Sequence, residues 1–225
     1  MQLQNLFDAT SALIVVGGTC AGTVLRCGLE DTGVALEAVM GLGRKRFDPA
    51  QARAELAAHV REIPRAGVLR AEPVHLGDPE LDGVTDALIG SRSLSGLHAT
   101  HMAFKRKRNR HGMRAVRTLN QAAELGPVFG LAGTLVSLSQ MPAAMGQGGD
   151  FTTAISMAVL TTLYGLLIGN IVFAPLGRMV ARRAAREERD RQRVLDWLEK
   201  QLADALPASS GPTVVRHRAV AGSAR

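Results

Sequence analysis

The sequence predicts an all-α membrane protein with three transmembrane helices. All 27 Lys and Arg residues lie in two blocks, Arg26–Arg117 and Arg178–Arg225, and the apolar stretch between them, Leu125–Gly177, has Asp150 as its one charged residue. A second charge-free segment, Ala9–Leu25, lies near the start of the chain. Because about 20 apolar residues cross a bilayer as a helix, the long stretch predicts two spans and the short segment predicts a third.

The first span is expected at about residues 9–26, within an N-terminal segment 1–29. A signal peptide carries its basic residues before the apolar core, whereas the first basic residue here, Arg26, follows it. Lys and Arg beside a span are retained on the cytoplasmic side. The N-terminus is therefore predicted to lie outside, and both basic blocks and the C-terminus in the cytoplasm.

Residues 30–118 are predicted to form a helical cytoplasmic region. Asp48, Pro49 and Gln51 are residue types favoured at the cap, the first and the third positions of a helix, which is expected to end near Pro64. Another helix is expected over about residues 79–107. A further helix should begin after Gly112 and continue into the next span.

Residues 119–180 are predicted to form a transmembrane hairpin, with spans at about 125–141 and 152–176. The segment between the spans, Pro142–Asp150, contains turn residues and neither Lys nor Arg, so it is placed on the non-cytoplasmic side. Small residues at four-residue spacing allow close helix contact, as at Gly18/Gly22, Gly126/Gly130 and Gly165/Gly169, and Gly133 is a further expected packing position. Hydroxyl groups at Thr134, Thr161 and Thr162 either face a polar pathway or bond to their own helix.

The last span is expected to continue as a cytoplasmic helix over residues 181–206, followed by a disordered tail, 207–225. A stripe at helical spacing predicts packing on a neighbouring helix, and it consists of Leu195, Trp197, Leu198, Leu202 and Leu206.

An enzyme is not expected, because the sequence has no nucleophile–base pattern, phosphate-binding loop or dinucleotide fingerprint. No cofactor or metal site is expected either: Cys20 and Cys27 are too far apart along a helix to pair, and His98 and His101 are interpreted as surface residues. The basic run Lys105–Arg110 lacks nucleic-acid-binding motifs, so we expect no nucleic acid there. Contact with anionic lipid or simple solvation remains open for this run.

Three segments resemble a known family. Leu125–Thr134, Ala158–Asn170 and Phe173–Leu176 are similar to the MotA/TolQ/ExbB proton-channel superfamily, and they are closer to MotA, the flagellar stator subunit, than to TolQ or ExbB. Ser11–Thr19 resembles the second span of MotA. The resemblance covers about residues 7–180, and it implies an ion-transporting subunit of the bacterial inner membrane.

The resemblance also implies roles for single residues. Thr134, Thr161 and Thr162 would line the proton pathway, and Pro127 and Pro175 would couple ion flow to movement. Arg65 and Glu72 lie in a stretch similar to the one that meets the rotor, although Arg65 is one residue nearer to Gly67 than in the family pattern.

The expected partners follow from the same resemblance: a homo-oligomeric ring of five copies, a MotB/TolR/ExbD-like single-span chain whose Asp carries the proton, a flagellar rotor protein, and the lipid bilayer. MotA has four spans and TolQ and ExbB have three. This chain is therefore either a reduced MotA-like homologue or lacks an upstream span because its start is misassigned. Three functions stay open: a stator subunit, a TolQ/ExbB-like energiser of outer-membrane transport or envelope integrity, and a non-conducting membrane scaffold.

Overall fold

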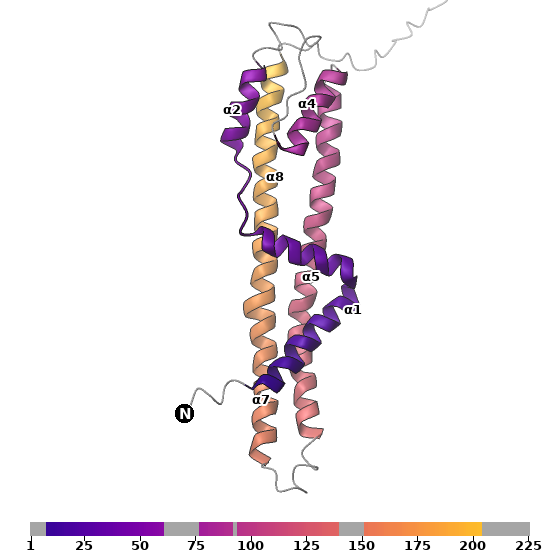
Figure 1. Cartoon of the computed structure of the whole chain (residues 1–225), viewed down its shortest axis with the longest axis vertical. Coiled ribbons are helices and arrows are strands. Elements are labelled where there is room, and N and C mark those ends of the chain that lie inside the picture. Colours follow the sequence, from indigo (N-terminus) through magenta and orange to yellow (C-terminus); the bar gives the residue numbers. More distant parts are fainter. Residues whose placement is uncertain (1–7, 61–76, 92–93, 140–150, 204–225) are drawn as a thin grey trace, which may run out of the picture. The chain divides into compact units, whose positions relative to one another are not determined.

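A computed structural model describes residues 8–60, 77–91, 94–139 and 151–203 (Figure 1). Its elements are the helices α1 (Ala9–Gly41), α2 (Pro49–Val60), α4 (Pro79–Ser91), α5 (Leu94–Ser139), α7 (Phe151–Leu167), the π-helix η3 (Ile168–Phe173) and α8 (Ala174–Ala203). Three segments are long and apolar enough to cross a membrane: Ala9–Gly41, Leu94–Ser139 and Ala154–Leu202. The predicted all-α architecture with three spans is therefore confirmed, whereas its orientation stays a prediction.

The chain divides into two compact units. The first unit comprises Met1–Phe47 and Lys105–Asp190, and the second unit comprises Asp48–Phe104 and Arg191–Arg225. The helices α5 and α8 contribute residues to both units.

In the first unit, α5 forms an antiparallel hairpin with the run from α7 to α8, and α1 packs across it (Figure 1). Helix α1 begins at an N-cap, because the Asp8 carboxylate accepts a hydrogen bond from the Ser11 backbone N–H. It bends at Gly28, where φ is 85° and ψ is 160°. Beyond the bend, Ala35 joins a buried cluster with Ala115 and Leu119 of α5 and Val180 of α8.

Two expected helix boundaries are wrong. The helix expected over residues 79–107 is divided, since α4 ends at Ser91 and α5 begins at Leu94. Gly90 and Ser91 have low helix propensity, which favours an end there. The helix expected to begin after Gly112 instead runs through it: a Cβ at Gly112 would lie 3.5 Å from Ala184 Cβ, so α8 packs closely against α5 at this point.

In the second unit, α2 and α4 pack with the N-terminal part of α5 and the C-terminal part of α8. Asp48 caps α2 as predicted, accepting hydrogen bonds from the N–H groups of Ala50 and Gln51. The core contains the predicted stripe residues Leu195, Leu198 and Leu202, against which Trp197 packs. Leu206 and the expected disordered tail lie outside the described residues.

Candidate functional site

The two arms of the hairpin touch backbone to backbone through their glycines. A Cβ at Gly165 would lie 2.5 Å from the Gly126 carbonyl oxygen and 2.9 Å from Gly130 Cα. A Cβ at Gly133 would lie 2.8 Å from Thr161 Cβ. Real Cβ atoms do not approach other atoms this closely, so glycine is required at these positions for the arms to pack as they do.

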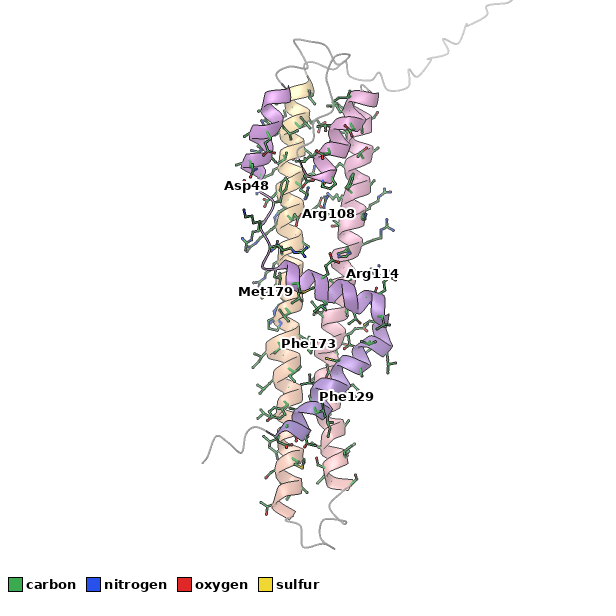
Figure 2. The ribbon with its side chains drawn as sticks, in the orientation of Figure 1. Asp48, Arg108, Arg114, Phe129, Phe173 and Met179 are labelled. Carbon is green, nitrogen blue, oxygen red and sulfur yellow. The ribbon has the colours of Figure 1, made fainter. Side chains whose placement is uncertain are left out.

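Helix α1 uses a second pair of glycines to receive a side chain from the hairpin. The Phe129 ring of α5, labelled in Figure 2, lies directly over Gly18 and Gly22. Any side chain at either glycine would overlap the ring. The glycine spacing in all three spans therefore serves close packing within one chain.

The three threonines occupy two different environments. Thr161 is fully buried at the contact with Gly133, whereas Thr134 and Thr162 are partly exposed. Each hydroxyl donates to a carbonyl of its own helix: Thr134 to Leu131 at 2.6 Å, and both Thr161 and Thr162 to Ala158, at 2.9 and 3.3 Å. A hydroxyl oxygen that donates in this way can still accept a hydrogen bond. Only Thr134 and Thr162 are accessible enough to offer one to another chain.

The two prolines lie at irregular backbone in the hairpin. Pro127 has no N–H, so the Ala123 carbonyl in the preceding turn of α5 loses its helical partner. Gly169 packs against that carbonyl: a Cβ at Gly169 would lie 2.5 Å from the Ala123 oxygen and 3.0 Å from Pro127 Cδ. Gly169 belongs to the π-helix η3, which ends just before Pro175. Pro127 therefore lies at a contact between the arms where ordinary α-helical hydrogen bonding is interrupted, and Pro175 lies two residues beyond the π-helix that makes this contact.

Two further hydroxyl groups, which the sequence analysis missed, are buried in α1. Ser11 and Thr19 are fully buried, and their side-chain oxygens have no hydrogen-bond partner in the described part of the chain. With Val15 and Thr23 they form one buried face of α1. The four-residue spacing of Ser11, Val15, Thr19 and Thr23 places them on one helix face, and this spacing can be read from the sequence.

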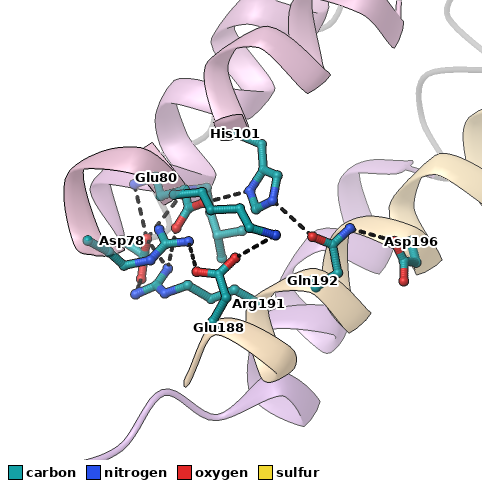
Figure 3. Close-up of polar contacts among 10 residues, drawn as sticks. Asp78, Glu80, His101, Glu188, Arg191, Gln192 and Asp196 are labelled. Carbon is teal, nitrogen blue, oxygen red and sulfur yellow. Dashed lines mark hydrogen bonds and ion pairs between the residues drawn. The ribbon is translucent and has the colours of Figure 1, made fainter. Parts of the chain in front are cut away.

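A buried polar network links three helices of the second unit (Figure 3). Arg191 of α8 bonds Glu80 at 3.0 Å and, through its other amino group, Asp78 at 2.8 Å. Burial raises the pKa of Asp78, but the hydrogen bonds and charge of Arg191 outweigh it and, with the backbone N–H groups of Glu80 and Leu81, hold that pKa below its ordinary value.

His101 completes this network, and its interpretation as a surface residue is wrong. The side chain is 2% exposed. Its Nδ1 lies 2.9 Å from Glu80 Oε1, and its Nε2 lies 3.1 Å from Gln192 Oε1. Gln192 is oriented by donating its own N–H to Asp196, so its amide oxygen faces the His101 ring. His101 is buried because α4, α5 and α8 pack together around it, and no local sequence motif predicts such packing.

The structure describes some of the remaining predicted residues and not others. Within the basic run, Lys105 and Arg108 pair with Glu188 of α8 at 3.2 and 2.8 Å, so part of the run serves helix packing. The predicted rotor-contact residues Arg65 and Glu72 lie outside the described residues. Among the residues that the structure describes, no group of His, Cys, Asp and Glu has the arrangement of a metal site.

The chain is similar in sequence to a known protein family and to several known relatives. Residues 96–193 match the model of the MotA/TolQ/ExbB proton channel family. The chain is 26% identical to the chemotaxis protein PomA of Vibrio alginolyticus, over 84% of this chain and 75% of the relative. It is 24% identical to motility protein A of Aquifex aeolicus, over 94% and 84%.

Two solved structures share the fold. The structure of C. jejuni MotAB matches with a TM-score of 0.79 at 16% identity, over 92% of this chain and 82% of that one. The flagellar MotAB stator complex from Bacillus subtilis matches with a TM-score of 0.75 at 15% identity, over 89% and 81%. The family model and the sequence relatives confirm the predicted resemblance to the MotA/TolQ/ExbB proton channel family, with MotA-like sequence, and the two solved structures show a shared fold.

Proposed function

We propose that the chain is a stator-type subunit of a proton-driven membrane motor. It forms a homo-oligomeric ring of five copies around the single spans of a MotB-like partner in the bacterial inner membrane, with its C-terminus in the cytoplasm. The relatives named as a chemotaxis protein and a motility protein, and the fold shared with MotAB, support this proposal. Ion flow through the complex is converted into force on a rotor, and the rotor-contact stretch at Arg65 and Glu72 belongs to the same proposal.

One observation carries the mechanism: the membrane-crossing segments lack a side chain that could carry a proton at neutral pH. Ala9–Leu25 and Leu125–Gly177 contain no Asp, Glu, Lys, Arg or His apart from Asp150, which lies outside the described residues. A charged group within a bilayer is costly, and functional ones are paired or line a polar path. The proton therefore travels on an Asp of the partner, and the subunit supplies hydrogen-bond acceptors beside it.

Thr134 and Thr162 are the acceptors that we assign to this path, because both hydroxyls are partly exposed. Thr161, which the family resemblance also places on the path, is fully buried at the glycine contact and is assigned to packing instead. Protonation of the partner's Asp changes its fit beside these hydroxyls, and the hairpin transmits the change. Pro127 and Pro175 lie where the hairpin backbone is least regular and can adjust.

The test compares two adjacent threonines. Thr162→Val is expected to lower proton flux about tenfold in liposomes that contain the chain and its partner, since one hydrogen bond to a charged group is lost. Thr161→Val removes a hydroxyl bonded to the same Ala158 carbonyl and is the matched control. Ring assembly should be intact in both variants. Unchanged flux in Thr162→Val would assign Thr162 to packing and refute the pathway.

The three candidate spans favour a second function, an energiser like TolQ or ExbB for outer-membrane transport or envelope integrity. The two functions differ in the partner and in the load. Co-purification decides between them: a partner with a peptidoglycan-binding domain indicates the stator, and a TolR- or ExbD-like partner indicates the energiser. A non-conducting scaffold would show no flux with either partner.

A further inference from the structure

A cavity of about 290 Å³ lies in the first unit, where the end of α1 meets the start of α8. Its lining includes Leu42 and Phe47 from the α1 end and Met179 from α8, which Figure 2 labels. These three side chains give the cavity an apolar wall. The apolar stretch of the sequence ends at Gly177, so the cavity begins within the first turn beyond the membrane-crossing segment.

Arg183 builds one wall of this cavity by fixing the chain that follows α1. Its two terminal nitrogens donate to the carbonyl of Leu42 at 2.7 Å and to that of Arg44 at 3.1 Å. Carbonyl groups at a helix end lack intrahelical partners, and a guanidinium with several donors can satisfy two of them together. Arg183 therefore joins the segment after α1 to α8 beside the cavity.

Three more arginines line the cavity and leave their side chains exposed: Arg46, Arg182 and Arg186. Two acidic residues, Glu187 and Asp190, line it farther along α8. Four arginines against two carboxylates leave the lining with a net charge of +2. The site thus combines positive charge with an apolar wall, a combination suited to an amphiphilic anion.

The position along α8 matches the depth of lipid headgroups. At 1.5 Å per residue, Arg182 lies about 7.5 Å and Arg186 about 13.5 Å beyond Gly177 along the helix axis, so Arg186 meets the headgroup layer through its long side chain. The headgroup layer is about 5–8 Å thick on each side of the hydrocarbon core. We propose that this cavity binds the headgroup of an anionic phospholipid: the phosphate contacts Arg46, Arg182 and Arg186, and the glycerol and upper acyl chains contact Leu42, Phe47 and Met179. The site is separate from the proposed ion path.

Lipid binding to the purified full-length chain in detergent tests this proposal, with native mass spectrometry as the readout and phosphatidylglycerol as the probe. Each basic side chain beside an anionic headgroup contributes roughly a fivefold factor. The variant Arg46→Gln/Arg182→Gln/Arg186→Gln is therefore expected to bind on the order of a hundredfold more weakly. Phosphatidylcholine, which has no net charge, should bind weakly to both proteins.

Two further variants distinguish a loss of lipid binding from a loss of folding. Arg178→Gln/Arg189→Gln removes two exposed arginines of α8 that do not line the cavity, and it should bind phosphatidylglycerol like the original chain. Glu187→Gln removes a negative charge from the lining, and it should strengthen binding severalfold. An equal loss in the control and cavity variants overturns the proposal, as does equal binding of the two lipids. Displacement of the bound lipid by millimolar inorganic phosphate would reassign the site to a soluble anion.

Discussion

Gly165 lies at one of the closest contacts between the two arms of the hairpin, and the atoms around it determine which residues that position can hold. The nearest atoms to a Cβ there belong to the backbone of Gly126 and Gly130, which cannot move aside as a flexible side chain can. Gly17, by contrast, lies in α1 with no atom within 4 Å of a Cβ. Two glycines in membrane-crossing helices thus differ in packing although the sequence presents both in apolar surroundings.

Gly165→Ala is expected to destabilise the protein by roughly 1–3 kcal/mol, because the arms must separate to admit the methyl group. Gly17→Ala is expected to be neutral or stabilising by up to about 1 kcal/mol, since alanine favours helix more than glycine does. Thermal unfolding of the full-length chain in detergent, followed by circular dichroism, measures both. Equal melting temperatures for the two variants would show that the arms do not depend on this contact.

At the scale of the element, the bend in α1 separates the membrane-crossing part from the part that lies across α5 and α8. Gly28 produces it with backbone angles that are essentially restricted to glycine. Arg114 of α5 then pairs with Glu30 and Asp31, just beyond the bend. A glycine five residues later, Gly33, has ordinary helical geometry and open space around it.

These two glycines of one helix should respond to alanine with opposite signs. Gly28→Ala is expected to cost about 1–3 kcal/mol in backbone strain. Gly33→Ala is expected to stabilise α1 by about 0.5–1 kcal/mol. The free energy of unfolding in denaturant, measured for both single variants, tests the bend directly. A stabilising effect at Gly28 would mean that α1 is straight.

At the scale of the whole molecule, apolar side chains remain uncovered on the membrane-crossing helices. Leu13 is 73% exposed, Leu135 69% and Val159 62%. A polar solvent would make these surfaces costly, whereas lipid or neighbouring subunits would cover them. The chain alone thus provides a packed three-helix unit with apolar outer faces and no proton-carrying group within its spans.

Purified alone in liposomes, the chain is therefore expected to conduct no more protons than empty vesicles. Addition of a partner with an intramembrane Asp should produce a proton current, and an Asp→Asn partner should not. A pH-sensitive dye inside the vesicles follows the current under an applied voltage. A sustained current from the chain alone would refute the division of labour between the subunits.

The spans and their small residues could be predicted because the bilayer imposes a simple rule on composition. The length of the apolar segments predicted the start of α1 near Ala9 and the two spans of the hairpin. The capping residue Asp48 predicted the start of α2. Residue spacing also selected Gly126 and Gly165. The continuous course of α5 through Gly112 could not be predicted in this way, because packing against α8 overrides the low helix propensity of glycine.

The sequence by itself determined that the chain is helical, that it has three segments apolar enough to cross a membrane, and that these segments hold no Asp, Glu, Lys, Arg or His. These properties depend on residue type and order along the chain, because the bilayer admits only helices with apolar side chains and paired backbone groups. Only the tertiary structure decided that His101 is buried between Glu80 and Gln192, that Thr161 is enclosed while Thr162 is accessible, and that arginines of α8 surround a cavity at the end of α1. Those properties depend on which faces of distant helices meet, and such contacts leave no local pattern in the sequence.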